Sequence, residues 1–256
     1  STFNNYSRHV AAISLYFGKI PTDLDPEQVH DYLFYLQKKS KTPSQTYFKH
    51  CVYGLRFLLK SEGLPYEFLR LPSIRYQKKL PVVLSKEEVW AMLQSAKLLK
   101  HKILIGLLYG CGLRCMEARS VRLQDLDFDR KQLKVVQGKG KKDRYVNLPT
   151  SVLVEMREYY KIYKPKTFLF EGIHHEQYSV RSAQAVFKNA MKKANINKTI
   201  GIHGLRHSYA THLLQQGTDI RYIKDLLGHN DIRTTTIYTQ VTNNSLQNIV
   251  SPLDSL

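Results

Sequence analysis

The sequence is poor in cysteine and in long apolar runs. Its 256 residues contain three cysteines, Cys51, Cys111 and Cys115, which cannot all pair, so no disulfide framework is indicated and a reducing compartment is expected. No second Cys or His pair stands at zinc-ligand spacing from Cys111 and Cys115, and we interpret both as small core residues. The absence of a signal-peptide pattern and of a membrane-length apolar run favours the cytoplasm.

Acidic residues are also scarce relative to basic ones. The chain has 39 Lys and Arg against 21 Asp and Glu, a net charge of +18. A lysine-rich surface can serve solubility alone, but this excess favours a polyanionic partner, nucleic acid above all. The basic residues have no hydrophobic anchor beside them, which counts against a membrane surface.

The first 70 residues predict a small helical domain. Asp25, with Pro26 and Gln28 after it, is a helix start, and Thr42 with Pro43 repeats the signal. Gly63 ends the last of these helices. Apolar residues at three-to-four spacing mark three buried faces: Phe3, Tyr6, Val10, Ile13 and Phe17; Val29, Tyr32, Leu33 and Leu36; and Phe48, Cys51, Val52, Leu55 and Leu59.

Residues 71–84 are proline-spaced and basic, which is typical of an interdomain linker and equally of a long surface loop. Ser85 and Glu88 form a capping box, so a second domain is expected over 85–256. Its pattern is helical except for a short apolar run at 168–170 and two β-type runs, 132–136 and 144–148, with Gly-Lys-Gly at the turn between the last two. The fold class predicted is therefore mainly α with a small β-sheet.

His203 and Arg206 are three residues apart and face one side near the start of a predicted helix. Such a helix start already favours an anion, to which Arg offers a bidentate fork and His a proton donor or acceptor. Taken alone, a His–Arg pair on a helix is more often simply solvated.

Two further segments carry similar residue types. Gly228 stops a helix and His229 follows it, after which Asn230 is expected to cap a helix from Asp231 to Thr239 that carries Tyr238. Upstream, a Gly-flanked turn delivers Arg114 to a helix start, and Glu117 one turn later can orient a basic group. The plainer alternatives are a packing tyrosine and an ordinary helix junction with a salt bridge.

Basic side chains gather in two more places. The hairpin tip has Lys139, Lys141, Lys142 and Arg144 with Asp143 alone opposing them, which suits phosphate contacts or a solvated turn. The helix predicted over 180–193 spaces Arg181, Gln184 and Lys188 on one face, which can enter the DNA major groove or be a solvated face above buried apolar residues.

Together these segments resemble the tyrosine recombinase (phage-integrase, Xer-like) family. The ordered pieces are Gly-Leu-Arg-x-x-Glu at 112–117, Gly-Lys-Gly at 138–140, His-x-Leu-Arg-His at 203–207, Leu-Gly-His at 227–229, and Tyr238 nine residues after His229. Each piece is weak alone, but the ordered set is specific, and it covers about residues 85–256. The first domain resembles the family's helical, SAM-like core-binding domain by architecture more than by motif.

The resemblance implies a catalytic set made of Arg114, Lys139, His203, Arg206 and His229, with Tyr238 as the nucleophile. It implies a site-specific recombinase that cleaves and rejoins DNA through a 3′-phosphotyrosine, with no cofactor and no metal. Lys139 is the expected acid for the leaving 5′ oxygen, His203 the expected base, and His229 a donor to the phosphate. A transposase of a mobile element, a type IB topoisomerase-like enzyme and a telomere resolvase share this chemistry and stay open as alternatives. A non-catalytic DNA-binding module with the same fold is a further alternative, but it does not explain six catalytic-type residues.

The same resemblance implies partners. Two domains closing as a clamp on a double-stranded site with two half-sites are expected, as a dimer on one site and a tetramer in synapsis, in association with the nucleoid. The segment 243–256 carries an apolar stripe, Leu246, Ile249, Val250 and Leu253, which must be covered by a neighbouring protomer or by its own chain.

Overall fold

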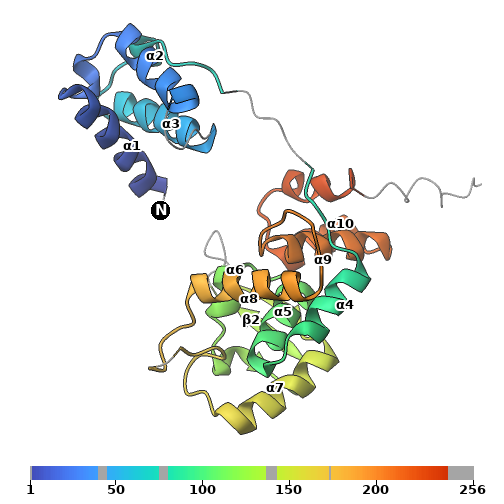
Figure 1. Ribbon diagram of the computed structural model, residues 1–256. Helices are drawn as coiled ribbons and strands as arrows, with labels where there is room; N and C mark the ends of the chain where they lie inside the picture. The colour runs from blue at the N-terminus through green and yellow to red at the C-terminus, as the bar shows by residue number, and fades with distance from the viewer. Residues whose placement is uncertain (1, 40–44, 75–79, 137–142, 173, 242–256) are drawn as a thin grey trace, which may run out of the picture. The chain divides into compact units, whose positions relative to one another are not determined.

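The computed structural model describes residues 2–39, 45–74, 80–136, 143–172 and 174–241 (Figure 1). The chain forms two compact units, Ser1–Lys78 and Lys79–Leu256. The division between them falls inside the stretch 71–84 that the sequence marks as proline-spaced and basic.

The described part of the first unit contains α1 (Thr2–Phe17), α2 (Pro26–Phe34), a π-helical turn (Tyr35–Lys39) and α3 (Gln45–Ser61), with 3-10 turns at Pro21–Asp23 and Tyr66–Leu69. Asp25 and Gln28 form the predicted capping box of α2. The predicted apolar residues of the second and third faces are buried, except Phe48, which is partly buried. The face of α1 is only partly so: Ile13 is buried, whereas Phe3 is 61% exposed and packs edge-on against Phe57. The helix start predicted at Thr42 lies outside the described residues.

The second unit is built around α5. Its helices in the described ranges are α4 (Lys86–Ser95), α5 (Leu99–Gly110), α6 (Cys115–Arg119), α7 (Thr150–Tyr163), α8 (Val180–Lys193), α9 (Gly204–Gln215) and α10 (Ile220–Leu227). Residues 103–108 of α5 are all buried, because α7 and α9 pack against it on different sides. Ser85 and Glu88 form the predicted capping box at the start of α4.

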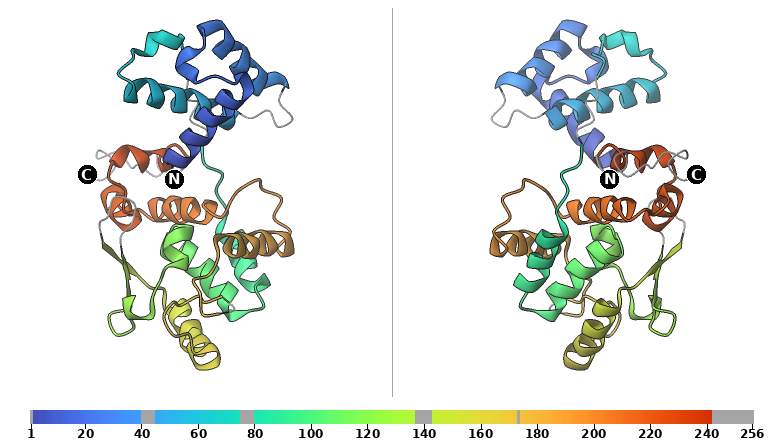
Figure 2. Two further views of the ribbon diagram at one scale, coloured as in Figure 1. Left: turned by 90° about the vertical axis from the view of Figure 1, so that its left-hand side faces the viewer. Right: turned by 90° about the vertical axis from the view of Figure 1, so that its right-hand side faces the viewer.

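A small antiparallel sheet has the order β1 (Leu126–Asp127), β2 (Gln132–Val135) and β3 (Arg144–Asn147). Leu133 pairs with Val146, and both point into the core. The sequence predicts β2 and β3 but not β1, since a two-residue strand is too short to show alternation. Figure 2 shows the sheet at one edge of this unit and α8 at the opposite edge. The mainly helical class with a small sheet is confirmed.

The segment after α10 differs from its prediction. Instead of a helix over 231–239, two 3-10 turns follow, Ile232–Thr234 and Thr236–Tyr238, and the capping side chain is that of Asp231 rather than Asn230. Residues 234–237 are all β-branched, which disfavours a regular α-helix. Tyr238 therefore stands at the end of a tight turn, with its side chain 2% exposed.

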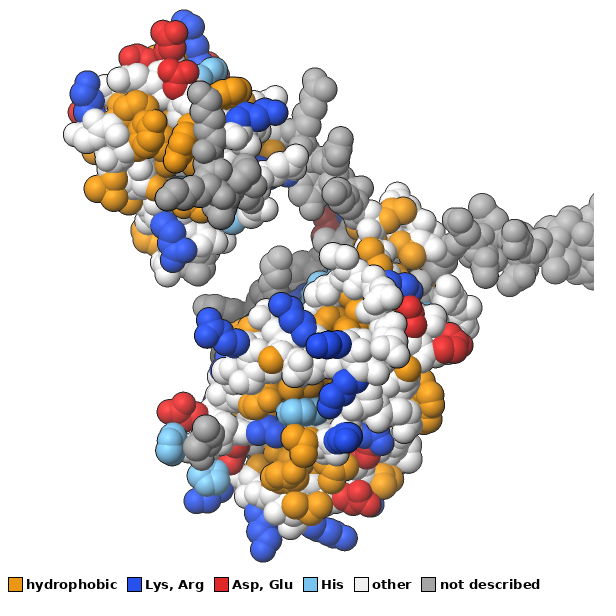
Figure 3. All heavy atoms as spheres, in the orientation of Figure 1, with side chains coloured by type: hydrophobic (Ala, Val, Ile, Leu, Met, Phe, Trp, Pro, Cys, Tyr) orange, Lys and Arg blue, Asp and Glu red, His pale blue; other side chains and the backbone are white. Residues whose placement is uncertain are grey.

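Two surface features bear on function. Residues 183, 186, 187 and 190 of α8 are buried, while Arg181, Gln184 and Lys188 are exposed on the other face. Lys and Arg side chains gather over this helix in Figure 3. Within the ranges that the structure describes, we find no helix with the length and apolar character to cross a membrane.

Candidate active site

A glycine turn places Arg114 at the start of α6. Gly112 has φ +59°, and a Cβ there would lie 2.4 Å from the ring of Tyr209, so both the backbone conformation and the space require glycine. The turn makes Arg114 the residue before α6, and its backbone N–H donates to Glu117 at 2.8 Å. Nη1 of Arg114 also lies 2.6 Å from the Glu117 carboxylate, an ion pair that fits both the predicted orienting role and an ordinary helix junction.

Glu117 also holds a second arginine, Arg144 from β3. Both terminal nitrogens of Arg144 donate to the carboxylate, at 3.1 and 2.8 Å, and Arg206 Nη1 lies 3.7 Å from it. Burial raises the pKa of Glu117, but hydrogen bonds from Arg144 and Arg114 outweigh it and lower the value to about 2. The carboxylate is therefore ionised and joins α6, β3 and α9.

The C-terminus of α10 meets the same three guanidinium groups. Arg144 Nε donates to the carbonyl of Leu226 at 2.8 Å, Arg206 Nη2 to that of Leu227, and Arg114 Nη2 to that of Gly228 at 3.4 Å. These carbonyls are the ones that a helix end leaves without intrahelical partners, and they carry the negative end of the helix dipole. The helix end thus aligns three arginines that come from distant parts of the sequence.

Positive charge exceeds negative charge in this cluster. Three guanidinium groups surround one carboxylate, which leaves a surplus of two positive charges. Arg206 is fully buried, donates to the carbonyl of Gly112 at 2.7 Å, and has no protein partner for its Nε within the described structure. Burial lowers the pKa of Arg206 to about 10, so the group stays charged at neutral pH. The cluster is suited to bind an anion such as phosphate.

His229 follows α10 and lies between Arg206 and Thr235. Arg206 Nη2 is 3.0 Å from His229 Nε2, and because a guanidinium only donates, Nε2 accepts. The ring proton is then on Nδ1, which donates to Thr235 Oγ1 at 2.9 Å. Burial and the Arg206 charge lower the pKa of His229 to about 4. The ring is neutral, and to donate to a phosphate its proton would have to move to Nε2.

Tyr238 reaches the cluster from the last 3-10 turn. Its hydroxyl lies 3.0 Å from Nδ1 of His207 on α9. His203 stands one helical turn earlier, with its ring edge-on to that of His207 at 4.7 Å between centroids. Partial desolvation, His207 and Arg206 lower the pKa of His203 to about 4. Burial raises the pKa of Tyr238 although Arg206 and Arg114 oppose it, so the hydroxyl is protonated at neutral pH.

The structure brings together four of the six residues predicted as catalytic, Arg114, Arg206, His229 and Tyr238, with His203 beside them through His207. Lys139 lies outside the described residues, as do Lys141 and Lys142. Arg144, predicted as a DNA contact, has a side chain 10% exposed that is bound to Glu117 and to α10, which places it among the residues that build the site. That Arg144 also contacts DNA stays a prediction.

Sequence reasoning missed His207 as a contact of Tyr238. His207 comes four residues after His203, so both rings lie on one face of α9. This spacing marks both histidines equally as candidates for the contact with Tyr238. Sequence reasoning also missed that the carbonyls at the end of α10 accept hydrogen bonds from the arginines. Every residue has a backbone carbonyl, so no residue type in the sequence indicates this contact.

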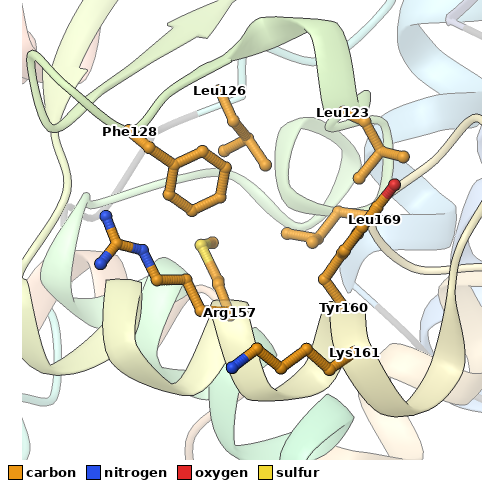
Figure 4. A pocket seen from close by; sticks show the side chains of 8 residues that line it. Leu123, Leu126, Phe128, Arg157, Tyr160, Lys161 and Leu169 are labelled. Carbon is orange, nitrogen blue, oxygen red and sulfur yellow. The ribbon is translucent and has the colours of Figure 1, made fainter.

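A separate cavity of about 450 Å³ lies between α7 and the chain around β1 (Figure 4). Its lining is mostly apolar and includes Leu126, Phe128, Met156 and Leu169, with Arg157 and Lys161 at its edge. None of the residues that surround Tyr238 lines it, so the cavity is no part of this site.

A helical domain with a three-stranded sheet thus brings arginines, histidines and a tyrosine together at one electropositive site, an arrangement suited to bind a phosphate group. The model of the phage integrase family matches residues 82–245. A tyrosine recombinase of Thermosipho africanus is 34% identical over 94% of this chain and 89% of its own length. Tyrosine recombinase XerA of Pyrococcus horikoshii is 36% identical over 78% of this chain and 70% of its own length. The chain belongs to the phage integrase family of tyrosine recombinases, and it is an enzyme of that family.

Solved structures agree in fold. The crystal structure of XerA recombinase is similar with a TM-score of 0.61 and 25% identity, over 95% of this chain and 88% of that one. XerH recombinase bound to its palindromic difH substrate, a post-cleavage complex, gives a TM-score of 0.77 with 21% identity over 95% of this chain and 77% of that one. At 21% identity, the similarity to XerH shows a shared fold alone.

Proposed function

We propose that the protein is a site-specific recombinase that cleaves and rejoins DNA strands, with Tyr238 joined covalently to a 3′ phosphate. The observation that carries this proposal is the convergence of Arg114, Arg206, His229 and Tyr238 from separate elements on one electropositive site. The scheme uses neither a metal ion nor ATP, because the phosphotyrosine retains the energy of the broken bond.

The proposed chemistry follows from the charges of the site. A phosphodiester attacked in line gains negative charge on its non-bridging oxygens, and preorganised donors such as Arg114 and Arg206 stabilise it by about 3–4 kcal/mol each. The attacking hydroxyl must lose a proton, since its pKa is raised, and the leaving 5′ oxygen must gain one. We assign the second task to Lys139 on the β2–β3 connection.

The test is a nicked suicide substrate from which the cleaved strand end is lost. Incubated with the protein and EDTA, it is expected to give a protein–DNA band that survives SDS. A band that needs added metal or ATP, or no band on any DNA that the protein binds, would contradict the proposal.

Lys139 offers a prediction of its own. Lys139→Ala is expected to slow adduct formation on ordinary DNA by about 100-fold or more, the usual scale of a general acid. A substrate with sulfur at the bridging 5′ position is expected to react at nearly the wild-type rate, because a thiolate leaves without a proton. Equal losses on both substrates would remove Lys139 from this role.

DNA binding is proposed to involve both units, closing as a clamp, with the first unit as the core-binding domain and α8 in the major groove. The exposed side chains of Arg181, Gln184 and Lys188 on α8 support the placement of this helix in the groove. The variant with all three changed to Ala is expected to bind more weakly, and the slope of log affinity against log salt is expected to fall by about two units if both cations contact phosphates. Lys161→Ala, on an exposed position of α7, is the control. An unchanged affinity would exclude α8 from the interface.

The segment 243–256 lies outside the described residues, and its docking into a neighbouring protomer stays a proposal. Deleting it is expected to leave binding to one half-site intact while cooperative filling of the second half-site and recombination are lost. Undiminished cooperativity on a two-site DNA, measured by gel shift, would assign the segment to its own protomer.

A further inference from the structure

The hydroxyl of Tyr238 faces a histidine that the catalytic set implied by the resemblance leaves unused. Nδ1 of His207 lies 3.0 Å from that hydroxyl, at hydrogen-bonding distance, with the rings 5.7 Å apart between centroids. His203, the base expected from the sequence, packs in a T-shaped arrangement with the His207 ring, and the centroids of the two rings are 4.7 Å apart. A base must first lie within reach of the proton it removes, and His207 satisfies that condition in the described structure.

We propose that His207 is the catalytic base that takes the proton of Tyr238, with His203 behind it as a positioning residue. The inference rests on the proposed strand-cleavage function. As the Tyr238 oxygen attacks, its bond to phosphorus forms, its proton passes to Nδ1 of His207, and the bond from phosphorus to the 5′ oxygen breaks. That oxygen takes a proton from the acid assigned to Lys139. Rejoining reverses each step, and His207 returns its proton to the departing tyrosine oxygen.

The surroundings of His207 suit this role. Among the residues that the structure describes, the charged and titratable groups that face it are His203 and Arg206 from α9 and Tyr238 from the last 3-10 turn. Burial and the Arg206 charge lower the pKa of His207 below its ordinary value of 6.5, so the ring is neutral and able to accept at neutral pH. The neutral ring accepts at Nδ1 when its proton is on Nε2.

The same helix provides a matched control. His212 is buried on α9, and its Nδ1 lies 2.8 Å from the hydroxyl of Tyr109, a pair of the same chemistry that contains no nucleophile. His212→Asn breaks a His–Tyr hydrogen bond of α9 just as His207→Asn does. A loss that is merely structural is therefore expected in both variants, whereas a changed pH profile is expected in one.

The experiment measures adduct formation from about pH 5 to about pH 9, a range that spans the titration of histidine. The substrate carries sulfur at the bridging 5′ position. Because a thiolate leaves without a proton, the pH profile then no longer depends on the protonation of the general acid. The wild-type rate is expected to be flat above neutral pH and to fall in acid as His207 is protonated. For His207→Asn we expect a rate about 100-fold lower at neutral pH that rises in proportion to hydroxide, since the proton must then leave to solvent.

His212→Asn and His203→Asn are expected to keep the wild-type profile, whatever their rates. A His207→Asn profile of wild-type shape, or a hydroxide-dependent profile in His203→Asn alone, would overturn the assignment. An absence of adduct in the wild type would instead contradict the proposed function.

A second measurement does not depend on the His207 variant folding. The pKa of His207 is measured by NMR in the wild type and in Tyr238→Phe. A hydroxyl that donates to Nδ1 stabilises the neutral ring, so its removal is expected to raise the pKa of His207. A lowered or unchanged pKa would show that Nδ1 does not accept from Tyr238, and the proposal would fail.

Discussion

Tyr238→Phe is expected to abolish the SDS-resistant adduct completely while DNA affinity stays within a few-fold of wild type. The change removes the hydroxyl oxygen that is proposed to attack, with its hydrogen bond to His207, but keeps the ring that packs with Ala210, Ile223 and Leu227. Folding and the electropositive cluster should therefore persist, because neither depends on the hydroxyl. The measurement pairs the suicide-substrate assay with a gel shift on the same DNA.

Tyr209→Phe is the matched control for that experiment. Tyr209 is a partly buried tyrosine that packs against the same small cluster of α9 and α10 residues. It is expected to retain adduct formation. Covalent trapping by Tyr238→Phe would show that another group is the nucleophile, and loss of the adduct in both variants would point to damage of the fold.

The second large effect is expected from Glu117→Gln. The carboxylate, 7% exposed, separates three guanidinium groups, and an amide in its place offers one acceptor and turns N–H groups towards other donors. Breaking a buried ion pair costs about 3–5 kcal/mol, so the free energy of unfolding should fall on that scale. Adduct formation should fall about 100-fold, because Arg114 and Arg206 lose the group that aligns them for the phosphate.

The pH dependence follows from the lowered pKa of Glu117, about 2 in the folded protein against an ordinary 4.5. A carboxyl whose pKa is lowered by folding stabilises the protein above its ordinary pKa, and this stability is lost as the pH falls through the folded value. The difference in unfolding free energy between wild type and Glu117→Gln should therefore shrink between about pH 4.5 and about pH 2.

Glu171→Gln is the control that separates the loss of stability from the loss of adduct formation. Burial raises the pKa of Glu171, but hydrogen bonds from backbone N–H groups such as that of Thr167 and from His175 lower it to about 2, and none of these partners belongs to the site. It is expected to lose stability but to keep the rate of adduct formation per folded molecule. If Glu117→Gln matched it in both respects, Glu117 would have a structural role alone.

Much of the fold could be predicted because its signals are local. The capping boxes at Asp25 and Ser85 satisfy helix N–H groups within four residues, and the apolar spacing of residues 180–193 gives the bounds of α8 as observed. The ordered motifs likewise indicated which arginines, histidines and tyrosine belong together. The turn that carries Tyr238 was predicted wrongly, because a β-branched run disfavours a helix that its cap and length alone would allow.

What the sequence could not show is which groups meet in space. Arg144 looks like one more cation of a basic hairpin, and only the packing of β3 against α10 turns it towards Glu117. His203 and His207 share one face of α9, so their spacing cannot decide which of them meets Tyr238. That choice depends on the path of the chain after α10.

The most direct test of strand cleavage through Tyr238 is the chemical identity of the adduct. The trapped wild-type complex is digested with protease and nuclease, and the modified peptide is sequenced by mass spectrometry. The expected product is a 3′ phosphate on Tyr238, with a free 5′ hydroxyl on the other DNA end. A phosphate on any other side chain, or a 5′-linked phosphotyrosine, would contradict the account.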